Sequence, residues 1–305
     1  QTLAIPPILD KSHTVVSAET GSGKTLSYLL PVLQRLVGAP TPTPHTVVMV
    51  PTQELVLQVA SVAAAVCPSV PTKVAHGRVG PTRHDECSLL ITTPVALRDN
   101  VRSRALDDVR CVVLDEADLL LSGSLKGDVV DYALKAFQGR TGNRRVQAVF
   151  AAATLPGRGP KSVSAFIDDN YPGATVVATQ GVHHPVANLR QTFLLGDTVS
   201  DDMGGEAPGD DKWRQGALVE ALLPEEVGTV PPTLVFAASV AEAKSVAGFL
   251  RHAAPGLKVG ALHKQQRTEA RKATLAKFMA GETRVVVCTD VAARGLDTCG
   301  ADHGV

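Results

Sequence analysis

Short hydrophobic runs rich in β-branched residues alternate along the chain with longer segments of helical periodicity. The runs at residues 14–17, 46–50, 89–92, 111–114, 146–151 and 175–178 predict strands. Helices are predicted between them at residues 26–37 and 54–66. Because continuous apolar strands alternate with helices, the pattern indicates a parallel sheet covered by helices on both faces.

The same alternation begins again after a polar connector at residues 180–187. Strands are predicted at residues 190–195, 233–237, 258–262 and 284–288, and helices at residues 212–223, 240–253 and 266–279. A length of 305 residues is also typical of about two domains. The sequence therefore predicts two α/β domains, residues 1–184 and 185–305.

Composition excludes several classes of protein. The chain is 44% hydrophobic and 20% charged, which argues against a largely disordered chain. Its longest apolar stretch, residues 59–67, is far shorter than the roughly 20 residues of a membrane-spanning helix. The 5 cysteines form no CxxC pair, so neither a disulfide framework nor a zinc site is expected, and a reducing intracellular setting is favoured.

The charges balance, with 30 basic and 30 acidic residues. One acidic stretch rich in Gly and Asp is expected to be a solvated loop, and its acids are Asp197, Asp201, Asp202, Glu206, Asp210 and Asp211. Since a local basic face decides binding to a polyanion, the zero net charge excludes no nucleic-acid partner.

A glycine-rich segment lies between the first predicted strand and the first long helix. It reads Ala18-Glu19-Thr20-Gly21-Ser22-Gly23-Lys24-Thr25. Glycines let the backbone wrap around phosphates, and the helix that follows presents its positive end. In such a loop Lys24 reaches the β- and γ-phosphates and the Thr25 hydroxyl ligates Mg²⁺. The segment predicts a phosphate-binding loop, although Ala18 stands where the general pattern has glycine.

An acidic segment, Asp115-Glu116-Ala117-Asp118, follows the predicted strand 111–114. At the carboxyl end of a buried parallel strand Asp115 can hold Mg²⁺, directly or through water, and Glu116 can orient or deprotonate the attacking water. By itself such a segment is more often a solvated turn. Downstream of a phosphate loop, however, it indicates a Walker B site, so the residues alone predict a Mg²⁺-dependent P-loop nucleotidase.

Further segments make the chain resemble the DEAD-box ATP-dependent RNA helicases. The phosphate loop reads AETGSGKT and the acidic motif reads VLDEAD; the other matching segments, in family order, are residues 51–55, 93–94, 152–154, 234–236 and 289–297. The resemblance covers nearly the whole chain. It implies two tandem RecA-like domains, ATP and Mg²⁺ as cofactors, and single-stranded or short duplex RNA as a partner recognised with little sequence specificity.

The resemblance also implies a role for particular residues. Gln1 resembles the glutamine that reads adenine, beside the loop residues 18–25. Catalysis is implied for Lys24, Asp115, Glu116 and Arg294, and contact with the nucleotide for Gly295 and Asp297. Positions that contact the RNA backbone are Pro51, Thr52, Thr93 and Thr289. Positions that couple the nucleotide site to the rest of the first domain are Asp118, Ala152 and Thr154.

Some positions depart from the family's pattern. Gln53 stands where the family usually has Arg, Val95 and Ala96 stand where it has Gly-Arg, and Ala152 stands where it has Ser. The loss of two cations near the RNA is expected to weaken the electrostatic grip. The loss of the serine hydroxyl removes a hydrogen bond from the element that links hydrolysis to strand separation. ATP binding is therefore better supported than unwinding.

The end of the chain also departs from the family. After Asp297 the family continues to an HRxGRxxR segment with an arginine finger, and no such segment occurs in this chain. An arginine finger raises the turnover rate by a factor of about 10³ to 10⁵. We therefore expect a C-terminally truncated second domain, a chain that binds ATP and hydrolyses it poorly, and an active full-length parent.

Three functions remain open at this point. The first is an ATP-dependent RNA helicase that binds single-stranded RNA through its backbone and separates short duplexes when ATP drives domain closure. The alternative is an ATP-gated RNA-binding clamp without unwinding activity. A DNA-directed helicase or generic P-loop ATPase is the third, and the DEAD letters and the Gln1 segment speak against it.

Overall fold

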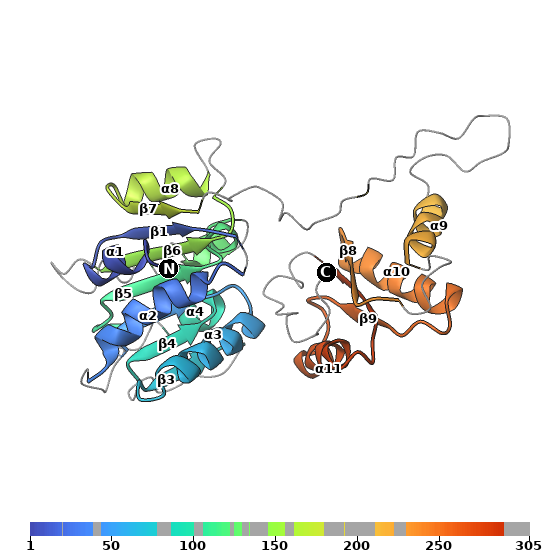
Figure 1. The fold of residues 1–305 in the computed structure, drawn as a ribbon, viewed down its shortest axis with the longest axis horizontal. Helices are drawn as coiled ribbons and strands as arrows, with labels where there is room; N and C mark the ends of the chain where they lie inside the picture. Colours follow the sequence, from blue (N-terminus) through green and yellow to red (C-terminus); the bar gives the residue numbers. More distant parts are fainter. Residues whose placement is uncertain are drawn as a thin grey trace. The chain divides into compact units, whose positions relative to one another are not determined.

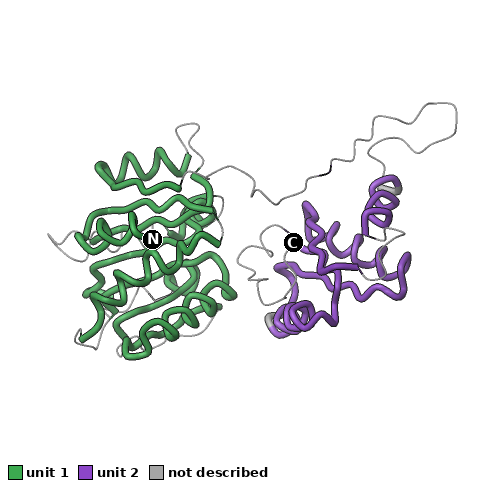
Figure 2. Tube along the Cα trace, viewed as in Figure 1, with its two compact units in different colours: residues 1–185 green, residues 186–305 purple. Residues whose placement is uncertain are grey.

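The computed structural model describes residues 1–19, 21–38, 44–77, 87–100, 106–122, 125–129, 134, 146–155, 162–179, 192, 211–222 and 230–289. The chain divides into two compact units, Gln1–Pro185 and Val186–Val305, coloured separately in Figure 2. The predicted connector 180–187 lies outside the described residues, as does nearly all of the predicted strand 190–195. The assignment of domains to residues 1–184 and 185–305 stays a prediction.

The first unit is built on a seven-stranded sheet. Its strands are β1 (Thr14–Ser17), β2 (Thr46–Met49), β3 (Thr72–Ala75), β4 (Leu89–Thr92), β5 (Cys111–Asp115), β6 (Gln147–Ala152) and β7 (Thr175–Ala178), in the order β3-β4-β2-β5-β6-β1-β7. All pairings between neighbours are parallel. Every residue of the central strands β1, β2, β4, β5 and β6 is buried, which explains their continuous apolar sequences.

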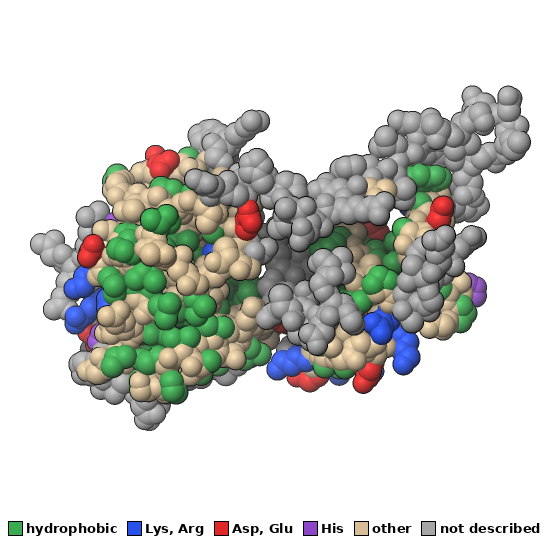
Figure 3. All heavy atoms as spheres, in the orientation of Figure 1, with side chains coloured by type: hydrophobic (Ala, Val, Ile, Leu, Met, Phe, Trp, Pro, Cys, Tyr) green, Lys and Arg blue, Asp and Glu red, His purple; other side chains and the backbone are tan. Residues whose placement is uncertain are grey.

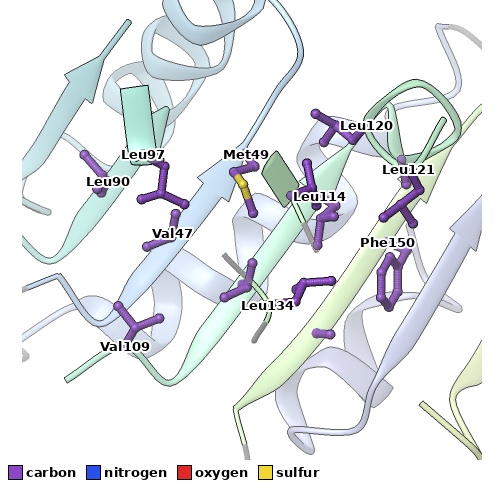
Figure 4. Packing of buried hydrophobic residues seen from close by; sticks show 14 of the residues in the cluster. Val47, Met49, Leu90, Leu97, Val109, Leu114, Leu120, Leu121, Leu134 and Phe150 are labelled. Atoms are coloured by element: carbon purple, nitrogen blue, oxygen red, sulfur yellow. The ribbon is translucent and has the colours of Figure 1, made fainter. Parts of the chain in front are cut away.

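Helices cover both faces of this sheet (Figure 1). One face packs against α1 (Ile5–Leu9), α2 (Lys24–Leu36) and α3 (Gln53–Val66). The other packs against α4 (Pro94–Asn100), α5 (Ala117–Leu120) and α8 (Val163–Asn170), with the short α6 (Leu125–Gly127) next to α5. Figure 4 shows part of this second cluster, in which Met49, Leu114 and Phe150 project from three adjacent strands. The predicted parallel sheet with two covered faces is confirmed.

The second unit has a three-stranded parallel sheet of β8 (Thr233–Ala237), β9 (Val259–Leu262) and β10 (Val285–Thr289), in the order β8-β10-β9. Helices α9 (Asp211–Leu222) and α10 (Val240–Ala253) pack on one face, and α11 (Thr268–Met279) packs on the other. The central strand β10 is buried throughout. The second unit therefore repeats the layered plan of the first.

Most predicted boundaries agree with the structure to within two residues. Helix α2 begins at Lys24, so the last two residues of the phosphate-loop motif are helical. One prediction is wrong: Asp211, expected in a solvated loop, is the first residue of α9. An acidic residue is favourable in the first turn of a helix, where the backbone N–H groups lack partners, so the acidic stretch does not exclude a helix start. The other acids of that stretch lie outside the described residues.

The outer surface of α3 is unusually apolar. Glu54 is the helix's one charged residue, and Leu57 and Val66 are each 39% exposed. Figure 3 shows hydrophobic side chains gathered on the face of the first unit that α2 and α3 form. Even so, none of the helices in the described part of the chain is both long and apolar enough to cross a membrane.

Candidate functional site

The glycine-rich loop connects β1 to α2, and its backbone conformation requires glycine at two positions. Gly21 and Gly23 have φ values of 77° and 83°, in the left-handed region that side-chain-bearing residues avoid. A Cβ at Gly23 would also collide with the side-chain amide of Gln1. The backbone N–H of Ala18 donates to the carbonyl of Ala152 at 3.2 Å, so the loop begins fixed to the end of β6.

Lys24, the first residue of α2, points back over this loop. Its side chain is only 9% exposed, and Nζ donates to the carbonyl oxygens of Ala18 at 2.6 Å and Glu19 at 2.8 Å. Burial lowers the pKa of Lys24, while the charges of Glu116 and Asp115 oppose that shift. A buried ammonium group that donates to loop carbonyls can exchange them for phosphate oxygens, which form stronger, charge-assisted hydrogen bonds.

Asp115 ends β5 close to this lysine and is 5% exposed. Its Oδ2 accepts a hydrogen bond from the Tyr28 hydroxyl at 2.7 Å, and its Oδ1 accepts one from the Glu116 N–H at 3.0 Å. Burial raises the pKa of Asp115, while the two hydrogen bonds and the charge of Lys24 lower it. The shift shows that these partners do not fully compensate the buried charge, as expected for a carboxylate that receives a cation.

The Thr25 side chain reaches the same point. Burial and Asp115 raise the pKa of Tyr28 well above its ordinary value, and a side-chain hydrogen bond with Thr25 opposes the shift. Thr25 and Asp115 thus offer hydroxyl and carboxylate oxygens, the hard ligands that Mg²⁺ prefers. In the described ranges no cluster of three or more His, Cys, Asp or Glu residues is suited to a metal ion. The residues therefore fit a Mg²⁺ ion that takes its remaining ligands from phosphates and water.

Glu116 has a strained backbone. Its φ of 53° and ψ of 49° lie in the left-handed region, which is unusual for a residue other than glycine. The strain occurs where β5 turns into α5, directly beside Asp115. Such strain is retained mainly at functional sites, where the surrounding structure holds the residue in place.

Asp118 and Thr154 meet across the same edge of the sheet. The Thr154 hydroxyl donates to Asp118 Oδ2 at 2.9 Å, which joins the segment after β6 to α5. Ala152, the last residue of β6, is fully buried. The three residues predicted to couple the site to the rest of the domain therefore lie at the same edge. A side-chain hydrogen bond joins Thr154 to Asp118, and a backbone hydrogen bond joins Ala152 to the start of the phosphate loop.

A pocket of about 430 Å³ opens beside the loop. It is lined by residues 1–4, the end of β1, the loop with the first turn of α2, and residues 177–179. Lys24 lies on its wall, and so does Gln1, whose side chain packs against Gly23. A pocket with mixed polar and apolar lining next to a phosphate loop has the chemistry to hold a base as well as phosphates.

The residues predicted to contact RNA lie at the carboxyl ends of strands. Pro51 and Thr52 follow β2, and Thr93 follows β4, its neighbour in the sheet. Thr52 caps α3 by accepting from the Leu55 N–H at 3.3 Å. Thr289 ends β10 in the second unit. The first three thus share the sheet edge that carries the loop and Asp115, as the parallel topology requires.

Sequence reasoning missed Tyr28, and part of the predicted site is not described. An aromatic residue among leucines in a helix is typical of core packing, and only its position one turn after Thr25 hinted at the site. Thr20, Arg294, Gly295 and Asp297 lie outside the described residues. Their predicted roles stay predictions.

Family comparisons agree with this geometry. The model described as DEAD/DEAH box helicase matches residues 1–163, and that described as helicase conserved C-terminal domain matches residues 214–305. The chain is 32% identical to the human protein named probable ATP-dependent RNA helicase DDX28, over 99% of this chain and 58% of that protein. It is 28% identical to DEAD-box ATP-dependent RNA helicase 39 of Arabidopsis thaliana, over 100% of this chain and 49% of that protein.

The fold is shared with a solved structure. Dbp5 of S. cerevisiae bound to RNA and ADP BeF3 matches with a TM-score of 0.74 at 21% identity, over 97% of this chain and 71% of that one. The predicted pair of RecA-like domains is confirmed by this likeness. The chain spans about half the length of the curated relatives it matches. Because the first family model covers more than half of its residues, the chain belongs to the DEAD/DEAH box helicase family.

Proposed function

We propose that the chain binds ATP with Mg²⁺ at the first unit and acts as an ATP-dependent RNA helicase. One observation carries the proposal: Lys24 lies buried between the phosphate loop and the carboxylates of Asp115 and Glu116, on the wall of a pocket that Gln1 also lines. The names of the relatives, which are ATP-dependent RNA helicases, support the same activity.

Nucleotide binding follows from the loop and the pocket. Lys24 leaves the carbonyls of Ala18 and Glu19 and binds phosphate oxygens, and the N–H groups of residues 18–25 surround the phosphates. The Gln1 amide, which can donate and accept at once, pairs with the edge of adenine. Thr25 and Asp115 hold Mg²⁺, which when bound neutralises charge on the phosphate oxygens.

Hydrolysis is assigned to Glu116. Its carboxylate orients the attacking water and accepts a proton from it, and its strained backbone fixes it next to Asp115. Arg294, Gly295 and Asp297 are proposed to complete the site from the second domain. Asp118, Ala152 and Thr154 then transmit the state of the nucleotide to the rest of the first domain, through the bond between Thr154 and Asp118.

RNA is proposed to bind along the carboxyl ends of the strands. Pro51, Thr52 and Thr93 contact the sugar-phosphate backbone from the first unit, and Thr289 does so from the second. Contacts of this kind carry little sequence information. Closure of the two domains on ATP would bend the bound strand. A DNA base-pair step is worth about 1.4 kcal/mol, so separating a few RNA base pairs would cost on the order of several kcal/mol. Bending of the bound strand is proposed to displace these base pairs.

Replacing Lys24 by Ala tests the nucleotide site. Titration with a fluorescent ATP analogue in the presence of Mg²⁺ is expected to give at least tenfold weaker binding, because charge-assisted bonds to the phosphates are lost. Lys126→Ala, which removes a lysine that packs over the Phe166 ring, is the matched control and should bind normally. Undiminished binding by the Lys24→Ala protein would overturn the proposal.

The RNA activity needs a separate test. ATP hydrolysis and separation of a short RNA duplex should be measured side by side, with single-stranded RNA and DNA of the same sequence as stimulants. RNA should stimulate hydrolysis more than DNA does, and the duplex should separate only with ATP. Stimulated hydrolysis without separation would identify the ATP-gated clamp instead, and equal stimulation by DNA would contradict an RNA-directed enzyme.

A further inference from the structure

The hydroxyl group of Tyr28 donates a hydrogen bond to Asp115 that core packing does not require. Tyr28 lies in α2, has no exposed surface, and donates to Asp115 Oδ2 at 2.7 Å across 87 positions of sequence. Phenylalanine would fill the same space without placing a polar atom in the core. Since a buried hydroxyl is unfavourable unless it is hydrogen-bonded, the bond to Asp115 defines where this polar atom points.

The hydroxyl also lies between the two side chains that are proposed to hold Mg²⁺. Thr25, one helical turn before Tyr28, has a side-chain hydrogen bond with this hydroxyl, and Asp115 accepts a hydrogen bond from it. Residues three apart on a helix lie on the same face, so α2 presents both hydroxyl groups to the end of β5. One buried group therefore connects the ligand from the helix with the ligand from the strand.

The carboxylate of Asp115 is held at both oxygens. The N–H of Glu116 binds Oδ1, and the Tyr28 hydroxyl binds Oδ2. With a donor on each oxygen, rotation of the carboxylate about its last bond breaks at least one hydrogen bond. Without the Tyr28 hydroxyl, the Glu116 N–H would be the donor that remains among the residues the structure describes, and the carboxylate could turn around it.

We infer that Tyr28 is a positioning residue for the magnesium site: its hydroxyl fixes the orientation in which Asp115 receives the ion. The inference rests on the proposed nucleotide site and adds to it a residue that does not itself touch metal or nucleotide. Groups that orient a metal ligand typically change metal affinity by 10- to 100-fold when they are removed. A residue that only filled the core would change stability without changing the dependence of nucleotide binding on the metal.

The test compares the affinity for a fluorescent ADP in excess Mg²⁺ with the affinity in EDTA. The ratio of the two measures how strongly metal and nucleotide binding are coupled. In Tyr28→Phe we expect this ratio to fall about tenfold or more, with the EDTA affinity unchanged. Tyr171→Phe is the matched control, since Tyr171 is a buried tyrosine of the same unit that packs edge-on against His13 and Phe150. Its ratio should equal that of the unmodified chain.

A double-mutant cycle separates positioning from any general effect of the substitution. If Tyr28 acts through Asp115, adding Tyr28→Phe to Asp115→Asn should lower the ratio no further. A further loss in that background, or an unchanged ratio in Tyr28→Phe alone, would overturn the inference. If Tyr28→Phe alone does not fold, as judged by thermal melting, a further loss in the double variant relative to Asp115→Asn would still overturn the inference, because neither of these two proteins has a buried charge at position 115.

The same measurement distinguishes failure of the inference from failure of the proposed function. An unmodified chain that binds ADP equally well with Mg²⁺ and with EDTA, or does not bind it, contradicts the nucleotide site itself. An unmodified chain with strong coupling and a Tyr28→Phe protein with the same coupling contradicts only the role of Tyr28.

Discussion

The carboxylate of Asp115 is unfavourable in the protein without nucleotide, because burial opposes its charge and raises its pKa. The folded protein therefore binds a proton at Asp115 more readily than the unfolded chain does. At pH 7 the charge destabilises the fold, and this penalty shrinks as the pH falls through the raised pKa. Asp115→Asn removes the charge while keeping an oxygen acceptor for the Glu116 N–H, and its amide NH₂ group can donate to the Tyr28 hydroxyl. We expect a higher melting temperature for the variant at pH 7.

The difference between the two proteins should decrease as the pH is lowered from 7 toward 4, since the native Asp115 then becomes protonated. Asp169→Asn, which removes an exposed carboxylate of α8, should give no such pH-dependent gain. Addition of Mg²⁺ and ADP should reverse the order, because only the carboxylate interacts favourably with the cation. Thermal melting across this pH range is the measurement, and a less stable Asn variant at pH 7 without nucleotide would contradict the prediction.

Glu116 leads to a different expectation, because its role is proposed to begin only after ATP is bound. Glu116→Gln keeps the size of the side chain and the left-handed backbone, with φ at 53°, but removes the proton acceptor. ATP affinity should stay within about threefold, while hydrolysis should fall by about 10² or more. Single-turnover hydrolysis and equilibrium binding on the same preparation are the measurements. A parallel loss of affinity and turnover would instead indicate a binding role.

At the scale of elements, one glutamine joins three segments of the first unit. Gln147, at the start of β6, donates through Nε2 to the carbonyl oxygens of Ile8 at 3.0 Å and Ser12 at 2.8 Å. Its Oε1 accepts from Arg35 near the end of α2, at 2.8 Å. Helix α1, which leads from Gln1 into the sheet, is held by these bonds together with its packing on α2.

Gln147→Ala should lower the free energy of unfolding of the first unit by about 2 to 3 kcal/mol, since buried carbonyl groups lose their donors. Gln34→Ala, an exposed glutamine of α2, is the matched control and should change it by less than about 0.5 kcal/mol. Circular dichroism in urea follows the unfolding of both units. Fluorescence of the chain's 1 tryptophan, Trp213, follows the second unit, because this residue lies in α9. A shift seen by both probes equally would contradict an effect confined to the first unit.

The sequence predicted the strands whose apolar runs are unbroken and missed a strand that a charged residue interrupts. Strand β5 was predicted because all of its residues are buried and apolar, so its hydrophobic run is continuous. Strand β3 was missed because Lys73 interrupts its short run of hydrophobic residues, whereas the other edge strand, β7, reads TVVA and was predicted. Helix α1 was missed because two prolines in a five-residue segment suggest a turn, although prolines are tolerated in the first turn of a helix.

The site shows a similar division. Lys24 and Asp115 could be predicted because each belongs to a short motif in which the neighbouring residues determine the chemistry. The bond between Tyr28 and Asp115 could not, since it joins residues 87 positions apart and depends on how α2 packs against β5. The backbone strain at Glu116 was equally hidden, because a residue's φ follows from the turn that the surrounding fold imposes.

At the scale of the whole molecule, both units place their candidate residues at the same kind of position. Thr52 and Thr93 follow strands of the first sheet, and Thr289 ends the central strand of the second. Parallel sheets with helical connections leave the loops after their strands free to bind ligands. A backbone-binding protein assembled from such edges gains affinity chiefly from phosphate contacts, so its affinity should depend strongly on salt.

Gln53 offers a direct test of that dependence. It is the first residue of α3, after the Thr52 cap, and its amide lies near Gly77. Gln53→Arg adds a cation at a helix N-terminus, where phosphate is already favoured, and should tighten the binding of single-stranded RNA. Each added phosphate contact steepens the plot of log affinity against log salt by about 0.7 for a single strand. Binding of a fluorescent RNA across a salt series measures both effects.

Ser61→Arg is the matched control for the change in net charge. It adds the same cation on the exposed side of α3, two turns from Gln53 and away from the strand ends. A general electrostatic effect would increase affinity and slope equally in the two variants, whereas a local phosphate contact would increase them only in Gln53→Arg. Equal changes would therefore contradict an RNA path over the N-terminus of α3, and a change confined to Gln53→Arg would support it.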